Sequence, residues 1–582
     1  MKTGIAFALV SLLSIFAVFA LVRVTDDDAF QKTAHDYIDQ YLRANPEDAT
    51  ELGDHRFDGQ LTDYSPAARA KELATQKFFR DELNAMETEG FHLTGANTID
   101  FRILKENIDY KIFQAEELKE PEWNPLVYMQ SLANSVYLLV ARDFAPPEKR
   151  ILNLRQRMDE IPRVIAQAKA NLQHPPRVHT ETAIEQTQGA ISLVREGLAP
   201  LLDQSPRMKK DLTPLQEKTA AALEDYKKWL QSDLLPRSDG DFRLGAEKYR
   251  KKLRFALASD LSMEEIMKRA TADLQQTQTA IYETALPLYK KYFPSADPAA
   301  AGLADKHEVT AAVVDKLAEQ HPDDATVVDY AKKIVTEATD FAKQHDLVTV
   351  PDVPLDVIAM PEFKRGVAIA YCDAPGPLDK TGKTFFAVAP TPKDWSKERR
   401  ESFFREYNNY MIRDLTVHEA MPGHFLQLAR ANEFRAPTLV RAIFQSGAFV
   451  EGWAVYCEQV MAEQGYGGPE VKMQQLKMRL RAICNAVLDQ SIHAGNMNEK
   501  EAMDLMMKGG YQQEGEAVAK WKRARLTSAQ LSTYFVGATE HLDLRAAEQR
   551  KLGKDFNLKK YNDQVVSYGS PPVKYVRELM GL

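Results

Sequence analysis

The sequence predicts a mainly α-helical protein, and three observations support this fold class. Apolar residues recur at three- and four-residue intervals along most of the 582 residues, with charged residues between them. Clusters of proline, glycine and aspartate separate these segments, as at 235–241. One stretch, 353–392, departs from the pattern and contains β-like sequence. We therefore expect many helices and one small sheet.

The helical segments follow one another from the N-terminal region to the C-terminal third. In the first half of the chain, the periodicity predicts helices at 30–45, 64–88, 98–118, 146–173, 180–201 and 208–233. In the second half, it predicts helices at 262–292, 308–320, 323–345, 397–432, 436–464, 470–492, 498–509 and 512–527.

The sheet is predicted from two short runs rich in β-branched and aromatic residues, Val367–Tyr371 and Thr384–Val388. The loop between them, Asp373–Lys383, contains proline and glycine, so we expect a small antiparallel sheet just before the helix at 397–432. An exposed strand there would be able to pair with an extended peptide. A purely structural hairpin is the alternative.

The N-terminus begins with an uncharged apolar run at residues 4–22, preceded by Lys2 and followed by three aspartates. This arrangement predicts a secretory signal, or an uncleaved membrane anchor, within residues 1–25. We expect no lipid anchor, because no cysteine follows the run. Residues 26–582 are predicted to form a single helical domain in a periplasmic or other extracytoplasmic space.

Composition excludes some classes of protein. Apolar residues make up 44% and charged residues 27% of the chain, which is typical of globular proteins. The net charge is −8 and no block of lysine and arginine is present, so we reject nucleic-acid binding. The three cysteines, Cys372, Cys457 and Cys484, are too few and too widely spaced for a disulfide framework or a cysteine-rich metal site.

The most informative segment is Leu-Thr-Val-His-Glu-Ala-Met-Pro-Gly-His-Phe-Leu-Gln, residues 415–427. A His-Glu pair followed by a second histidine on a helix is a common way to hold catalytic zinc beside a general base. Here His418 and His424 are six residues apart, and on a continuous helix their directions would differ by about 120°. An uninterrupted helix would therefore prevent both side chains from binding one ion.

Pro422 and Gly423 resolve this conflict. Proline lacks an N–H group and clashes with the carbonyl four residues earlier, and glycine tolerates backbone angles that other residues avoid. We therefore predict a break in the helix that turns His424 back toward His418. Glu419 would then be free to take a proton from water.

A third metal ligand is expected from a neighbouring helix. Glu451 lies 27 residues after His424, in the otherwise apolar segment Ser-Gly-Ala-Phe-Val-Glu-Gly-Trp-Ala-Val-Tyr-Cys-Glu. Because buried acids are normally paired or metal-bound, this carboxylate is the best candidate. Glu458 is seven residues later on the same face, where it could orient a ligand histidine. The active-site helices would span about 397–464.

These residues resemble a bacterial family known only as domain of unknown function 885. The segments His-Glu-Ala-Met-Pro-Gly-His (418–424) and Glu-Gly-Trp-Ala-Val-Tyr (451–456) match its motifs, and similarity extends over nearly the whole chain after the leader. The family is in turn distantly similar to helical zinc peptidases that include angiotensin-converting enzyme, oligoendopeptidases and thermostable carboxypeptidases.

The resemblance implies a large two-lobed helical fold, with a deep channel and a small antiparallel sheet beside the active site. It implies that His418, His424 and Glu451 bind Zn²⁺. It also implies that His493 and Tyr534 stabilise the oxyanion, next to Glu419 as general base.

The expected function is zinc-dependent hydrolysis of short peptides. A zinc hydrolase for a non-peptide amide or ester, or a non-catalytic peptide-binding relative, are the alternatives. The sequence leaves the oligomeric state open.

Overall fold

The computed structural model describes residues 25–294, 306–360, 369–379, 382–393 and 395–582. The predicted leader, residues 1–25, falls almost entirely outside the described residues. Within the described ranges, no helix is both long enough and apolar enough to cross a bilayer. The protein is mainly α-helical with one small sheet, as the sequence predicts.

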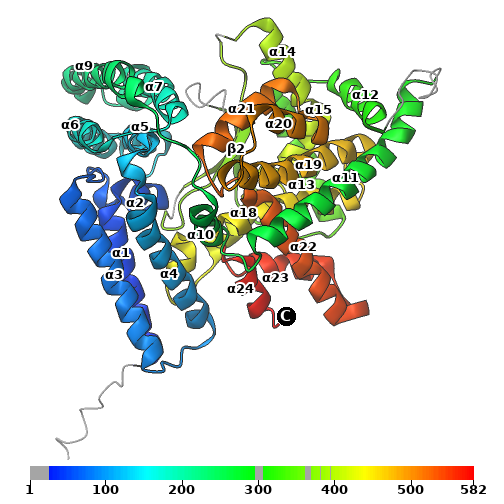
Figure 1. Cartoon of the computed structure of the whole chain (residues 1–582), viewed down its shortest axis with the longest axis horizontal. Helices are drawn as coiled ribbons and strands as arrows, with labels where there is room; N and C mark the ends of the chain where they lie inside the picture. Colours follow the sequence, from blue (N-terminus) through cyan, green and yellow to red (C-terminus); the bar gives the residue numbers. More distant parts are fainter. Residues whose placement is uncertain (1–24, 295–305, 361–368, 380–381, 394) are drawn as a thin grey trace, which may run out of the picture.

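Helices of the first half pack on one another before the chain reaches the sheet (Figure 1). They are α1 Asp26–Ala44, α2 Pro46–Leu52, α3 Pro66–Thr88, α4 Gly95–Phe113, α5 Pro125–Ala141, α6 Pro147–Asn171, α7 Arg177–Ser192, α8 Ala199–Leu202 and α9 Pro206–Trp229. α10 Ala246–Leu257 then leads to α11 Met263–Tyr292, α12 Lys306–Ala318 and α13 Val327–Gln344. In Figure 1, α1–α9 (blue to teal) gather on one side of the molecule and α11–α13 (green) on the other.

Helices of the second half carry the residues of the candidate site. They are α14 Lys397–Glu406, α15 Asn409–Glu419, α16 His424–Glu433, α17 Val440–Ile443, α18 Gly447–Glu463, α19 Gly468–His493, α20 Glu499–Asp504, α21 Glu514–Leu526, α22 Ser532–Leu552, α23 Leu558–Val566 and α24 Val573–Leu579. Short π-helical turns extend α4, α7, α9 and α20, at 114–118, 193–197, 230–234 and 505–509.

Most predicted helices are confirmed, but α2, α5, α10 and α22–α24 were not predicted. α5 contains no charged residue, and α22 is apolar around much of its first half. Helices buried on several sides lack the charged stripe on which a periodicity argument depends. The predicted helix at 397–432 is divided into α14, α15 and α16.

The sheet is mixed, which corrects the prediction of a small antiparallel sheet. Its strands are β1 Leu355–Ala359, β2 Ala370–Asp373 and β3 Thr384–Val388, in the order β1-β3-β2. β2 and β3 pair antiparallel as expected, whereas β1 pairs parallel with β3. β1 is bounded by Pro354 and was not predicted. β2 is packed against α15, so one edge of the sheet borders the candidate site.

α18 and α22 approach each other most closely where Gly452 faces Gly537. A Cβ atom on Gly452 would lie 2.3 Å from the backbone carbonyl carbon of Gly537, so neither position tolerates a larger residue without movement. The core around this contact includes Phe449, Trp453 and Tyr456, all almost fully buried. This packing fixes the helix that carries Glu451.

Candidate metal centre

The helix breaks between α15 and α16, as Pro422 and Gly423 predict. α15 ends at Glu419 and α16 begins at His424, and the Met421–Pro422 peptide bond is cis. The Gly423 N–H donates to the Val417 carbonyl at 2.9 Å. A Cβ atom on Gly423 would lie 1.9 Å from the His418 carbonyl oxygen. Only glycine fits this close approach of the chain to the end of α15.

The break brings the two histidines together despite their six-residue spacing. The imidazole centroids of His418 and His424 are 4.7 Å apart, and their planes are nearly perpendicular at 87°. The Nε2 atom of each ring lies 3.4 Å from Oε2 of Glu451 on α18. One potential ligand atom from each residue lies within 4.8 Å of the others. The structure therefore groups the three predicted ligands.

A second carboxylate orients the first histidine. Oε1 of Glu458 lies 2.6 Å from Nδ1 of His418. Because a carboxylate oxygen accepts this hydrogen bond, Nδ1 carries a proton, and Nε2 is the nitrogen that faces Glu451. On the same helix, Trp453 donates its indole N–H to the Pro422 carbonyl at 3.0 Å. α18 thus stabilises both the break between α15 and α16 and the orientation of the His418 ring.

The charges of this group are unbalanced without a cation. Asp414, Glu419, Glu451 and Glu458 lie around the two histidines, and no lysine or arginine of the described residues forms an ion pair with them. Within this group, four buried atoms have no hydrogen-bond partner in the described part of the chain: Oδ2 of Asp414, Nδ1 of His424, Oε2 of Glu451 and Oε2 of Glu458.

Buried polar atoms are normally satisfied, so this set indicates a missing partner. Two imidazole nitrogens and one carboxylate oxygen are the donor set of catalytic zinc sites, which keep a fourth position for water. Burial would raise the pKa of Glu451, but the adjacent imidazoles of His418 and His424 lower it overall. Glu451 is therefore available as an anionic ligand.

Glu419 links the site to the sheet. Its Oε2 accepts the backbone N–H of Cys372 in β2 at 3.0 Å. Burial raises the pKa of Glu419. The neighbouring histidines oppose this shift, and the charge of Glu451 adds to it. A carboxylate with a raised pKa, held beside a metal site, suits a general base. The contact with Cys372 was not foreseen, because a backbone donor has no sequence signature.

Tyr534 is on the first turn of α22, one turn before the Gly452–Gly537 contact. Its hydroxyl accepts hydrogen bonds from Nη2 of Arg523 at 3.2 Å and from Nε2 of Gln530 at 3.4 Å. Burial and then the charge of Glu451 raise the pKa of Tyr534, so the hydroxyl keeps its proton. A protonated phenol near Glu451 is able to donate to an oxyanion.

His493 is engaged elsewhere. Its Nε2 lies 2.9 Å from the Ala524 carbonyl and 2.8 Å from the Thr527 carbonyl, so Nε2 carries the proton. Its ring stacks on Tyr249 with centroids 5.8 Å apart. It lines a polar cavity of about 270 Å³ together with residues of α7 and α10. None of its contacts reaches the histidines of the metal centre, and its predicted oxyanion role stays a prediction.

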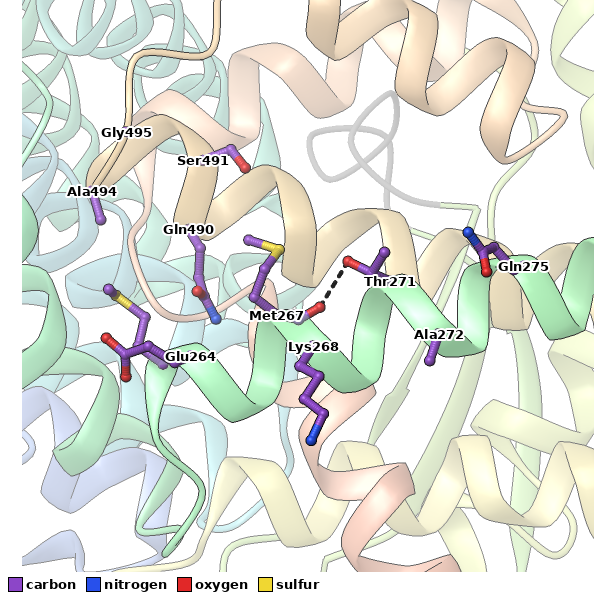
Figure 2. Close-up of a pocket in the computed structure, with 11 residues that line it drawn as sticks. Glu264, Met267, Lys268, Thr271, Ala272, Gln275, Gln490, Ser491, Ala494 and Gly495 are labelled. Carbon is purple, nitrogen blue, oxygen red and sulfur yellow. Dashed lines mark hydrogen bonds between the residues drawn. The ribbon is translucent and has the colours of Figure 1, made fainter.

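A second, wider groove lies between α11 and α19 (Figure 2). Its volume is about 810 Å³, and Met267, Thr271 and Gln490 are among the residues that line it. Figure 2 shows the side chain of Gln490 pointing from α19 toward α11. No residue of the metal centre lines this groove.

Comparison with known proteins gives the family of the chain. The family model described as "Bacterial protein of unknown function (DUF885)" matches residues 46–580. A solved structure described as "a putative lipoprotein of unknown function from Shewanella oneidensis" is 34% identical, with a TM-score of 0.79, and the match covers 95% of this chain and 100% of that one.

A second solved structure, described as "the putative lipoprotein from Colwellia psychrerythraea", has a TM-score of 0.76 at 17% identity, covering 96% of this chain and 99% of that one, and shares the fold. No curated protein matches the chain. With the family model spanning residues 46–580, the chain belongs to the bacterial family of unknown function DUF885.

Proposed function

We propose that this protein is a zinc-dependent peptidase that hydrolyses short peptides. The observation that carries the proposal is the convergence of the Nε2 atoms of His418 and His424 on Oε2 of Glu451, beside the buried carboxylate of Glu419. This is the donor set and the neighbouring base that zinc hydrolysis requires.

Each residue has a defined task in this proposal. His418, His424 and Glu451 would hold Zn²⁺, which as a Lewis acid would lower the pKa of a bound water to about 7. Glu419 accepts the proton of the attacking water and passes it to the nitrogen of the leaving amine. The Tyr534 hydroxyl donates a hydrogen bond to the carbonyl oxygen as it becomes negatively charged.

The sheet edge provides a place for the substrate. β2 is at the end of the strand order, and its Cys372 N–H points to Glu419, away from β3. An extended peptide is able to pair with such an edge. Short peptides also fit the proposed location, since an extracytoplasmic enzyme meets peptides released from larger proteins. The apolar run at residues 4–22 and the lipoprotein descriptions of the two solved relatives support that location.

The test is metal analysis of the purified protein followed by digestion of a mixed peptide library. We expect about one zinc per chain and cleavage of peptides by the zinc-loaded protein. The matched control is Glu419→Gln, which should keep zinc and lose about 10²–10⁴-fold in turnover. Zinc without peptide cleavage would reject the peptidase and leave a hydrolase of non-peptide amides or esters, or a peptide-binding protein.

A further inference from the structure

Arg523, on α21, bonds to Tyr534 and has no anionic partner among the described residues. Its Nη2 donates to Oε1 of Gln530 at 3.0 Å and to the Tyr534 hydroxyl at 3.2 Å. Within the described ranges it forms no ion pair, and its Nε and Nη1 have no hydrogen bond. A half-buried guanidinium is normally paired with an acid, so its free donors indicate a partner that comes from outside the chain.

Tyr534 connects Arg523 to the metal centre. It lies one turn before Gly537 on α22, and Gly537 packs directly against Gly452, the residue after Glu451. The charge of Glu451 contributes to the raised pKa of Tyr534, which agrees with this proximity. Arg523 is therefore one hydroxyl group away from the position proposed for the reacting carbonyl.

The buried charges on the α21 side of Arg523 have an excess of positive charge. One turn earlier on α21, Lys520 belongs to a buried group of charges that we call the paired cluster. It consists of Glu406, Lys477, Arg481, Glu516 and Lys520. Its two carboxylates already meet three cations, and with Arg523 the count is four cations against two acids. No carboxylate of the paired cluster is left over for Arg523, and the local field favours an anion.

We propose that Arg523 binds a carboxylate of the substrate, and that the substrates are peptides whose free C-terminus lies one or two residues beyond the scissile bond. The inference rests on the proposed function and names its substrate class. A planar guanidinium matches a carboxylate better than other anions of a peptide. The main-chain carboxylate of a peptide is always on the leaving-group side. Each residue advances an extended chain by ~3.3–3.6 Å, so only a nearby C-terminus reaches Arg523.

The experiment compares three N-acetylated tetrapeptides with the zinc-loaded full-length protein. They are identical except that the first ends in a free carboxylate, the second in an amide, and the third in an amide with glutamate as its last residue. We expect the free acid to be cleaved with a kcat/KM at least about 10-fold above that of either amide.

The variants test the residue. Arg523→Gln should lower kcat/KM for the free acid by about 10- to 100-fold, mainly through KM, and leave the amide unchanged with zinc retained. Arg523→Lys, which keeps the charge, should restore part of the difference. Arg525→Gln is the matched control, because Arg525 is on the same helix but lies over the Trp521 ring at 5.0 Å.

Equal cleavage of acid and amide by the wild-type protein, or equal losses for both in Arg523→Gln, would overturn the inference. If the peptide amide that ends in glutamate is preferred, Arg523 binds a side-chain carboxylate, and the inference that it binds the C-terminal carboxylate is overturned. If no peptide is cleaved, the proposed function fails, and calorimetry with Glu419→Gln still tests Arg523. Tighter binding of acid than amide supports the inference, and equal binding rejects it.

Discussion

The candidate metal centre and the paired cluster are both buried groups of charge in the second half of the chain, but they are built differently. In the paired cluster, Glu406 accepts from Lys477 and Arg481, both at 2.9 Å, and from the backbone N–H of Gln513 at 3.2 Å. In the metal centre, acids surround two histidines, and several oxygen and nitrogen atoms have no described partner.

This difference is what the proposed metal site predicts. Both oxygens of Glu406 meet donors, whereas Oε2 of Glu451 and Oε2 of Glu458 have no hydrogen-bond partner among the described residues, which agrees with a ligand from outside the chain. Arg523 is also incompletely satisfied, but it is a cation. Among the described residues its Nε and Nη1 have no acceptor, and its Nη2 donates to the Tyr534 hydroxyl. Tyr534 relates the two groups, since its hydroxyl bonds to Arg523, while burial and the charge of Glu451 raise its pKa.

The largest expected effect comes from removing a ligand. In His424→Ala, the Nε2 atom that faces Glu451 is lost, and we expect the zinc content to fall to background and peptide hydrolysis to fall at least about 1,000-fold. Elemental analysis and steady-state kinetics check both results. His321→Ala is the control, because His321 bonds to Glu401 outside the centre and should keep its zinc. A His424→Ala protein with stoichiometric zinc would show that the converging histidines are not the ligands.

Breaking the paired cluster should affect stability without affecting the metal. Lys477→Met leaves Oε2 of Glu406 without its lysine, and removal of one partner of a buried pair costs about 3–5 kcal/mol. We expect this loss in urea unfolding, together with unchanged zinc content in the folded protein. Lys500→Met removes an exposed lysine and should change stability by less than about 0.5 kcal/mol. Loss of zinc in the folded Lys477→Met protein would contradict the separation of the two groups.

A smaller effect is expected from the carboxylate behind the ligand. Glu458→Gln weakens the hydrogen bond to Nδ1 of His418, so the zinc dissociation constant should rise about 10- to 100-fold while the metal still binds. Competition with a zinc chelator measures this change. Glu463→Gln, on the same helix but paired with Arg545 near the surface, should leave zinc affinity unchanged. Equal zinc affinities of the two variants would show that Glu458 does not support zinc binding by His418.

The sequence predicted the fold class and most helices, because amphipathic periodicity reports directly on helices with one exposed face. It did not predict α5, whose residues are apolar or uncharged throughout, or β1, which is short and lies between prolines. The sequence also did not predict the direction in which the strands pair. β1 pairs parallel with β3 through contacts that depend on the whole fold.

The candidate site was predicted where its chemistry follows from local sequence. The break at Pro422 and Gly423 is confirmed, because the properties of these two residues act within one turn. The contacts of Glu419 with the Cys372 N–H and of Tyr534 with Arg523 were not predicted, since they join segments 47 and 11 residues apart by tertiary packing. His493 matches a motif, yet its Nε2 is bonded to two carbonyls.

The pH dependence of the free energy of unfolding should show how strongly the paired cluster disfavours the charged form of Lys520. The pKa of Lys520 is lowered to about 8, mainly because the ammonium group is buried. The charge of Glu516 opposes this shift, and the charges of Arg481 and Arg523 add to it. In the unfolded chain this pKa is about 10.4. Between these values the unfolded state binds more protons than the native state, so the stability of the wild-type protein should rise with pH.

Lys520→Met removes this contribution. The stability of the wild-type protein relative to Lys520→Met should therefore increase by about 2 kcal/mol between pH 7 and pH 9.5, measured by urea unfolding at each pH. Lys522→Met is the control, because Lys522 lies on the same helix in a partly exposed pair with Glu185. A parallel pH dependence of the wild-type and Lys520→Met proteins would mean that the paired cluster fully compensates Lys520. The excess positive charge attributed to the surroundings of Arg523 would then be smaller than the count of residues indicates.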